Sequence, residues 1–269
     1  MDYIKAMEAR RAVRTYNPDK PLSDKEISEI QESIDSAESP FGGHVAVKMH
    51  HFDLEGKQTP STYGSVSGAS WYMLVGFPED RNSALSAGFK QAQVALTIFS
   101  MGLGTNWMTD TFSGSVFQKA ADFPSETPLH VIMPVGYPAD KQRLVEKLTH
   151  KMLGSATRKP FDSLFFSGDF NHPVSEDSPF YKPLEYMRSA PSAYNKQPWR
   201  ALVDGKKIYF YQEPSRDSLI GMGIGLAQFY FSLLQLGNKG SWESTDNAPA
   251  HDGWEPIISF TLTDQGPVS

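Results

Sequence analysis

The chain has 269 residues, no cysteine and a formal net charge of −6 at pH 7. Hydrophobic residues make up 39% of the chain, which is typical of a folded globular protein. The lack of cysteine excludes disulfides, thiolate nucleophiles and iron–sulfur ligands, and the acidic balance without a basic stretch argues against a nucleic-acid partner. No apolar run reaches the ~18 residues that cross a bilayer, and the first residues are charged, so we expect a cytoplasmic protein without a membrane partner.

The first part of the chain predicts two helices joined by a cationic loop. An amphipathic segment at Tyr3–Met7 indicates a short helix, and the arginines of 10–14 follow it. Ser23–Glu26 is a capping box, in which the serine and glutamate side chains each accept from the other residue's backbone. A second helix is therefore expected from this point, ending before Pro40.

The middle of the chain alternates between strand and helix patterns. Apolar stretches rich in β-branched and aromatic residues predict strands, and longer apolar stretches bounded by glycine predict helices. The expected strands are 45–52, 71–77 and 130–135, and the expected helices are about 85–101 and 144–152.

An internal repeat is the most informative feature of the sequence. Gly88–Trp107 aligns without a gap on Gly223–Trp242, with glycine, alanine, glutamine, glycine and tryptophan matching in order. Upstream of the aligned stretch, segment 39–44 corresponds in position to 190–195. Downstream of it, segment 128–135 corresponds to 256–262. The order helix, turn, strand, helix, strand is therefore expected twice.

Two copies of one unit usually pack about a twofold axis. We expect an α+β fold with two similar α/β halves, 1–166 and 167–269, intertwined about a pseudo-twofold axis. The helix predicted near 223–236 is apolar on every side, so it should be buried at the centre. The chain would then be a monomer that acts as a pseudo-dimer.

Several kinds of active site are excluded by their spacing. Gly64–Gly68 has Val66 where a hydrolase elbow needs a serine nucleophile. His50 and His51 are adjacent and point to opposite faces of a strand, and no His-Glu-x-x-His occurs, so we expect no metal site. No side chain can be assigned as a catalytic acid or base.

Gly221-x-Gly223-x-Gly225 is only a weak match to a dinucleotide-binding loop. Its third glycine comes one residue early, and the strand predicted at 208–211 ends about ten residues before it, whereas a Rossmann turn directly follows its strand. We interpret these glycines as small residues that let buried helices approach closely.

Two polar segments could recognise a ligand. Arginines that alternate after a helix can direct two guanidinium groups at one phosphate, although a solvated surface cluster is also possible. The segment 190–200 places hydroxyl and amide groups between two prolines at a helix-to-strand junction, where they could contact a flat heterocycle or simply cap a turn. These groups belong to Arg10, Arg11 and Arg14 in the first segment and to Ser192, Asn195 and Gln197 in the second.

Five motifs together resemble the FMN-dependent nitroreductase family, in its single-chain duplicated branch. They are Arg-Arg-x-x-Arg at 10–14, Gly-Leu-Gly-Thr-x-Trp at 102–107, Pro-Val-Gly-Tyr-Pro at 134–138, Arg-Lys-Pro at 158–160 and Ala-Pro-Ser-x-x-Asn-x-Gln-Pro-Trp at 190–199. The resemblance implies FMN bound at a subunit interface, reduced by NAD(P)H and reoxidised by a nitroaromatic, quinone or similar acceptor.

The resemblance also implies which residues hold the cofactor. Arg10 and Arg14 match contacts to the phosphate and the flavin rim, and Arg158 matches an arginine that closes on the phosphate. The Pro-Ser-x-x-Asn turn, contributed by the other subunit in a homodimer, would come from the second half. The full expected set is Arg10, Arg11, Arg14, Ser65, Thr109, Asp110, Arg158, Pro191, Ser192, Asn195 and Gln197.

The sequence also departs from the family pattern. Ala12 stands where the family usually has serine, which removes a hydrogen bond worth ~1 kcal/mol. Segment 62–65 lacks the asparagine and lysine side chains that many family members offer to the pyrimidine ring of the flavin. We expect Ser65 to contact the ring in their place. The turn at 39–44 lacks the asparagine and glutamine of 190–197, so a mirror-image second site should be degenerate.

Two alternatives to this function stay open. One is a protein that binds FMN without turnover, as a carrier or interaction module. The other is a different flavin reaction on the same fold, such as flavin fragmentation or reductive dehalogenation.

Overall fold

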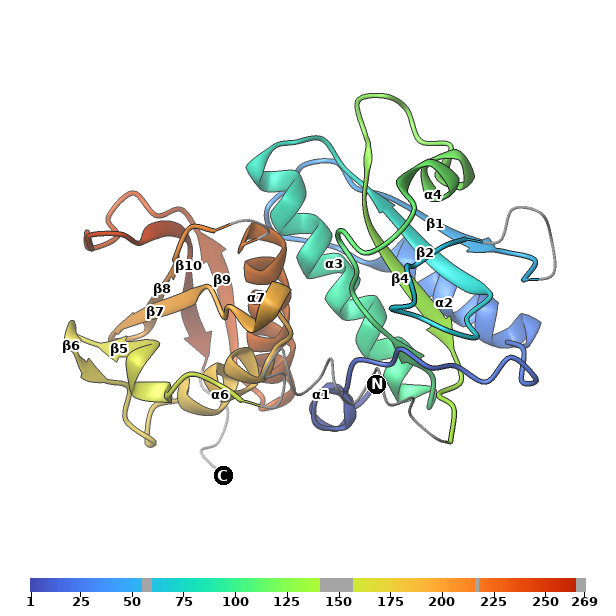
Figure 1. The fold of residues 1–269 in the computed structure, drawn as a ribbon. Coiled ribbons are helices and arrows are strands. Elements are labelled where there is room, and N and C mark those ends of the chain that lie inside the picture. Colours follow the sequence, from blue (N-terminus) through green and yellow to red (C-terminus); the bar gives the residue numbers. More distant parts are fainter. Residues whose placement is uncertain (55–59, 141–156, 216–217, 265–269) are drawn as a thin grey trace. The chain divides into compact units, whose positions relative to one another are not determined.

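The structure is a computed structural model of the chain and describes residues 1–54, 60–140, 157–215 and 218–264. It divides into two compact units (Figure 1). The first unit comprises Met1 and Lys5–Met152, and the second comprises Asp2–Ile4 and Leu153–Ser269.

The first unit has a four-stranded sheet with the order β1-β2-β4-β3, antiparallel at every pairing. In Figure 1 helix α3 lies across this sheet, and α2 and α3 are in contact. The elements are α1 (Tyr3–Ala9), α2 (Asp24–Ser36), β1 (Ala46–His51), β2 (Trp71–Gly76), α3 (Arg81–Ser100), β3 (Gly104–Thr105), α4 (Gly114–Ala121) and β4 (Leu129–Gly136).

The starts of the two longer helices follow from local side-chain bonds. The capping box of α2 is confirmed, because Ser23 Oγ accepts from the Glu26 N–H at 3.3 Å and the Glu26 carboxylate accepts from the Ser23 N–H at 2.7 Å. Helix α3 begins four residues before the expected position 85. The Asp80 side chain accepts from the Ser83 N–H at 2.9 Å and so caps an earlier turn.

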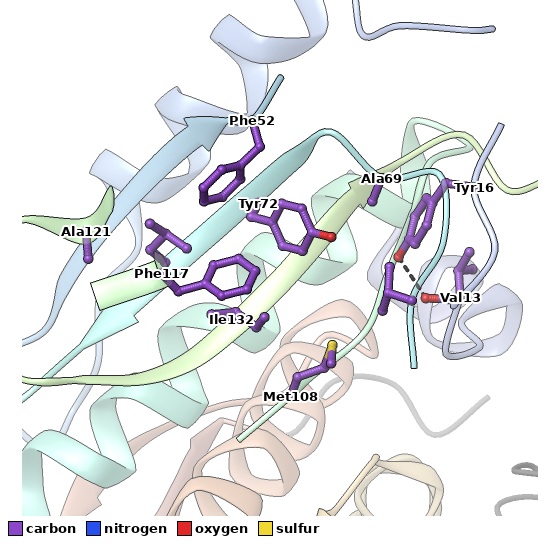
Figure 2. Packing of buried hydrophobic residues seen from close by; sticks show 11 residues of the cluster. Val13, Tyr16, Phe52, Ala69, Tyr72, Met108, Phe117, Ala121 and Ile132 are labelled. Carbon is purple, nitrogen blue, oxygen red and sulfur yellow. Dashed lines mark hydrogen bonds between the residues drawn. The ribbon is translucent and has the colours of Figure 1, made fainter. Parts of the chain in front are cut away.

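A cluster of aromatic rings packs α4 against the first sheet (Figure 2). Phe52, Tyr72 and Phe117 meet edge to face, with ring centroids 5.2 to 5.6 Å apart. Val13 and Tyr16 belong to the same buried cluster. The core of the first unit therefore fixes the cationic loop at Val13 and the residues that follow it.

The second unit has a six-stranded sheet with the order β6-β5-β7-β8-β10-β9. Strand β5 is parallel to β7, and the other pairings are antiparallel. The elements are η1 (Phe161–Ser163), β5 (Phe165–Ser167), β6 (Asp169–Pro173), α6 (Tyr181–Ser189), η2 (Ala193–Asn195), β7 (Trp199–Asp204), β8 (Lys207–Gln212), α7 (Ser218–Gln235), β9 (Lys239–Glu243) and β10 (Glu255–Asp264).

The two units repeat one topology. Apart from α4, which lies between β3 and β4 and has no counterpart between β9 and β10, the order α2, β1, β2, α3, β3, β4 in the first unit matches α6, β7, β8, α7, β9, β10 in the second. The strand order β1-β2-β4-β3 likewise matches β7-β8-β10-β9. An internal duplication and packing about a pseudo-twofold axis stay predictions.

The described residues 157–166, which the sequence-based division places in the first half, lie in the second unit. Strand β5 pairs with β7 there. The helix expected at 144–152 lies outside the described residues.

Helix α7 is mostly buried, as expected from its apolar residues on every side. Among the residues that the structure describes, it is the single helix long and apolar enough to cross a membrane, and 72% of it is buried, as in a core helix. Gly221 and Gly225 lie inside α7, so they form no dinucleotide loop. A Cβ at Gly225 would lie 2.9 Å from Trp199 Cε3 and 3.3 Å from Met187 of α6, which confirms that close packing requires this glycine.

Candidate functional site

The segment after α1 connects three predicted parts of the site within the first unit. The Arg10 N–H donates to the Ala6 oxygen at 3.0 Å, so the first arginine continues the last turn of α1. The Val13 N–H donates to the Thr105 oxygen at 3.1 Å, and the Ser67 N–H donates to the Arg14 oxygen at 3.0 Å. The structure thus brings the arginine segment, the loop that contains Ser65 and the motif at 102–107 side by side.

Two glycines permit this close approach. A Cβ at Gly104 would lie 2.5 Å from Val13 Cγ2, which leaves no room for a side chain. Gly68 has a φ of +78°, and a Cβ there would collide with the Tyr16 carbonyl. The Tyr16 hydroxyl donates to the Val13 oxygen at 2.7 Å and stabilises this conformation of the segment (Figure 2).

The individual first-unit residues differ in exposure. Arg10 and Arg14 are half-buried, whereas Arg11 is exposed. Ser65 is half-buried, with its N–H donating to the Thr62 oxygen at 2.8 Å. Thr109 is half-buried and Asp110 exposed, directly after the backbone pair between Met108 and Ile132 of β4.

Two buried polar side chains beside the arginine segment were not singled out from the sequence. Thr105 is 2% exposed and Asn106 is 5% exposed. Thr105 Oγ1 and Asn106 Nδ2 have no hydrogen-bond partner among the residues that the structure describes. Both lie in the Gly-Leu-Gly-Thr-x-Trp motif, and that motif is the signal that could have found them.

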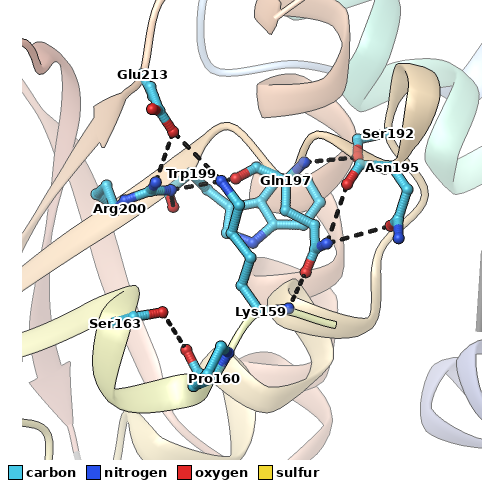
Figure 3. Close-up of polar contacts among 9 residues, drawn as sticks. All are labelled: Lys159, Pro160, Ser163, Ser192, Asn195, Gln197, Trp199, Arg200 and Glu213. Carbon is cyan, nitrogen blue, oxygen red and sulfur yellow. Dashed lines mark hydrogen bonds and ion pairs between the residues drawn. The ribbon is translucent and has the colours of Figure 1, made fainter. Parts of the chain in front are cut away.

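The turn at 190–197 in the second unit has an unusual backbone. The φ angles of Tyr194, Asn195 and Gln197 are 51°, 55° and 50°. Residues other than glycine rarely adopt this left-handed backbone conformation. Ser192 stabilises the turn, because its Oγ accepts from the Gln197 N–H at 2.9 Å and its carbonyl accepts from the Asn195 N–H at 3.0 Å (Figure 3). Pro191 is half-buried at the start of this turn.

Arg158, Ser192, Asn195 and Gln197 form one hydrogen-bond network, and Figure 3 shows its bonds among Lys159, Ser192, Asn195 and Gln197. Arg158 donates from Nη1 to Asn195 Oδ1 at 3.4 Å and from Nη2 to the Ser189 oxygen at 2.9 Å. The Lys159 N–H donates to Gln197 Oε1 at 2.8 Å, and Gln197 Nε2 donates to the Asn195 oxygen at 3.0 Å. The Arg-Lys-Pro motif and the turn, far apart in sequence, therefore meet in the second unit.

Positive charge is concentrated around this network. Burial lowers the pKa of Arg158, and the neighbouring Arg188 lowers that pKa further, although a guanidinium stays protonated at neutral pH. Glu213 Oε2 accepts from Arg200 Nη2 at 2.6 Å and from Lys159 Nζ at 3.3 Å. Burial raises the pKa of Glu213, but these two cations outweigh it and hold the pKa below its usual value.

The carboxylate that connects these cations belongs to Glu213, which was not expected from the sequence. Glu213 lies one residue beyond β8, and Arg200 is the second residue of β7. The hairpin register brings them together, and no local sequence pattern reports it. Among the described residues, no group of histidine, aspartate and glutamate side chains could hold a metal ion.

The predicted site residues therefore form two sets, one in each unit. The first set carries the arginines of 10–14 with Ser65, Thr109 and Asp110, and the second carries Arg158 with Pro191, Ser192, Asn195 and Gln197. The joining of the two sets into one site stays a prediction.

A family model described as "Putative TM nitroreductase" matches residues 2–233. No curated protein sequence gives a significant match to this chain. The crystal structure of "a putative nitroreductase" from Thermotoga maritima MSB8 is similar over 98% of this chain and 95% of its own, with a TM-score of 0.59 at 18% identity.

Two further solved structures are similar over part of the chain. A nitroreductase family protein from Clostridium difficile 630 has a TM-score of 0.47 at 13% identity and covers 66% of this chain and 99% of its own. A nitroreductase with bound FMN from Bacteroides fragilis NCTC 9343 has a TM-score of 0.43 at 15% identity and covers 54% of this chain and 92% of its own.

Proposed function

This chain belongs to the nitroreductase family and has its α+β fold, and from this premise we propose that it is an FMN-dependent oxidoreductase. The reductant would be NADH or NADPH, and the acceptor a nitroaromatic, a quinone or a similar small molecule. The observation that carries the proposal is the packing of the arginine segment against β3, in a chain that the family model matches over 2–233.

The residues present fit this cofactor. A phosphate dianion is best bound by guanidinium groups that donate paired hydrogen bonds, and both units supply arginines. The buried Thr105 Oγ1 and Asn106 Nδ2, beside the arginine segment, are polar atoms without a partner among the described residues and so favour a polar ligand.

Each unit would contribute a different part of the binding. We assign Arg10, Arg14 and Arg158 to the phosphate and Asn195 and Gln197 to the polar rim of the flavin ring. The network that ties Asn195 and Gln197 to residues 157–159 restricts these side chains in advance, which lowers the entropy lost on binding.

The chemistry supplied by bound FMN would be acceptance of a hydride from the nicotinamide and its transfer to the acceptor. The protein itself would bind and orient first the nicotinamide and then the acceptor. We also propose that the protein is cytoplasmic and that it functions as a monomer whose two halves act as a pseudo-dimer.

Two measurements test the proposed function. Purified protein should carry flavin absorbance or regain it when apoprotein is titrated with FMN. Under anaerobic conditions NADH or NADPH should bleach that absorbance, and a nitroaromatic or quinone should restore it. Failure to bind FMN would overturn the whole proposal. Binding without bleaching by either nicotinamide would overturn the enzymatic part and favour a carrier.

A further inference from the structure

Thr105, the second residue of β3 in the first unit, carries a buried hydroxyl group. The residue is 2% exposed, and its Oγ1 has no hydrogen-bond partner among the residues that the structure describes. Buried hydroxyl groups in folded proteins are usually hydrogen-bonded, because an unpaired one has lost its bonds to water without replacement. The Thr105 hydroxyl is therefore available to a group that binds here.

The backbone of Thr105 is fixed on both sides of the strand. On one side the residue pairs with Val135 of β4, which is 1% exposed. On the other side it forms a parallel bridge with Ala12, in which the Thr105 oxygen accepts from the Val13 N–H at 3.1 Å. The strand cannot turn the hydroxyl toward water without breaking these pairings.

The Thr105 side chain lies on the same side of the arginine segment as Arg14. Residues paired in a bridge project to the same side, so the Thr105 side chain lies beside the small methyl group of Ala12. The backbone bonds at Val13 and Arg14 keep the segment extended, and successive residues of an extended segment project to opposite sides. Because Val13 projects into the aromatic cluster, Ala12 and Arg14 project away from it, together with Thr105.

We propose that the Thr105 hydroxyl binds the phosphate of the flavin nucleotide, by donating a hydrogen bond to a phosphate oxygen. This role rests on the proposed function, in which Arg10 and Arg14 belong to the same phosphate site. A threonine hydroxyl can act as a donor, and its bond to a charged acceptor is stronger than a bond between neutral groups. Bound phosphate would also satisfy the hydroxyl that is unpaired in the flavin-free protein.

Thr105→Val tests this role, because it removes the hydroxyl and keeps the β-branched shape that suits a strand. The affinity of the apoprotein for FMN should fall about ten- to a hundredfold, the value of one hydrogen bond to a charged group. The affinity for riboflavin, which has the same ring system and no phosphate, should stay unchanged. Without flavin, the variant should unfold at a higher urea concentration than the wild type, because a methyl group replaces an unpaired buried hydroxyl.

A matched control lies on α3 of the same unit. Thr97 Oγ1 lies 3.0 Å from Ser33 Oγ, so this hydroxyl already has a partner within the fold. Thr97→Val should lower the urea midpoint and leave the affinities for both flavins unchanged. Thr105→Ser, which keeps a hydroxyl, should bind FMN nearly as tightly as the wild type. Thr105→Ala repeats the affinity measurements if Thr105→Val does not fold.

Three results would overturn this role of Thr105. They are an unchanged FMN affinity in Thr105→Val, an equal loss of affinity for FMN and riboflavin, and a lower urea midpoint of the flavin-free variant, which would show that the hydroxyl stabilises the fold itself. If Arg10→Ala weakens FMN binding and Thr105→Val does not, only the role of Thr105 is refuted. If the wild-type protein binds no FMN, the proposed function fails and this role fails with it.

Discussion

Arg10 and Asn195 are held in different ways, and this decides how each can be tested. The Arg10 backbone is fixed by α1, so removing its side chain leaves the segment in place. Asn195 has a φ of 55° and a side chain that bonds to Thr157 and Arg158, so its removal alters the turn itself. A variant at position 195 therefore needs a control for backbone strain.

Arg10→Ala should lower the affinity for FMN about ten- to a hundredfold, because a hydrogen bond to a charged group is worth ~1.5–3 kcal/mol. The protein should still fold, since the Arg10 N–H keeps its bond to the Ala6 oxygen. Flavin fluorescence titration and a thermal scan check both. Arg81→Ala, at the first residue of α3, is the control and should bind normally. Normal flavin retention in Arg10→Ala would contradict the assignment.

Asn195→Gly should weaken FMN binding about fivefold, the value of one neutral hydrogen bond, while the turn keeps its backbone. Asn195→Ala should weaken binding similarly and also lose ~1 kcal/mol of stability, since alanine tolerates a positive φ poorly. Affinity and the free energy of unfolding are measured for both variants. Wild-type affinity in the glycine variant would show that Asn195 contributes to the turn alone.

Glu213→Gln should lower the free energy of unfolding at pH 7 by about 1 kcal/mol, a value kept small because the carboxylate is half exposed. The folded-state pKa is below the ordinary 4.5, so the carboxylate stabilises the protein above pH 4.5 and this contribution is lost as pH falls through the folded pKa. Urea unfolding at pH 7 and pH 3 checks this. Glu29→Gln, which breaks the exposed pair with Lys25, should change little. A difference that stays constant down to pH 2 would rule the explanation out.

At the scale of elements, α7 shows how composition and packing combine. Its apolar residues on every side require burial, and its glycines allow Trp199 and Met187 to approach the helix axis. Strand β3 depends on a similar approach, because Gly104 admits Val13 of the arginine segment. Small residues therefore decide how closely elements pack at both places.

Gly225→Ala should destabilise the protein by about 1–2 kcal/mol. The added methyl group would lie 2.9 Å from Trp199, and the overpacking exceeds the gain in helix propensity. Gly114→Ala, at the first residue of α4 where a Cβ meets nothing within 4 Å, is the matched control and should be neutral or stabilising. Chemical denaturation measures both. Equal effects of the two substitutions would argue against close packing at Gly225.

At the scale of the whole molecule, the repeated topology raises the question of a second cofactor site. The turn at 39–44 is the first-unit counterpart of 190–195, but it is tied to serines of α3. Ser39 Oγ lies 2.7 Å from Ser86 Oγ, and the His44 N–H donates to Ser83 Oγ at 2.9 Å. This turn is thus held by serine hydroxyls of α3, and it has no amide side chain that could correspond to Asn195 or Gln197.

We predict one FMN per chain, with the chain functional as a monomer. A second site would combine the turn at 39–44, which has no amide side chains, with a second-half arginine segment that the sequence does not contain. Without those charged partners a dianion should lose several kcal/mol of binding. Flavin absorbance per protein, combined with light scattering for the mass, measures the ratio. A ratio near two, or two FMN molecules in a crystal, would refute the prediction.

The sequence by itself determined the α+β pattern, the capping box at Ser23, the burial of α7 and the repeated order of elements. These features depend on short-range periodicity and on local hydrogen bonds, which neighbouring residues encode. It did not reveal α4, the early start of α3 at Asp80, or the contacts of Glu213 with Arg200 and Lys159. Only the tertiary structure decided that the arginine segment packs against Gly104 and Ser67, and that residues 157–159 join the turn at 190–197. These contacts connect residues distant in the chain, and pairings across a sheet or a turn are set by packing and register rather than by any pattern along the sequence.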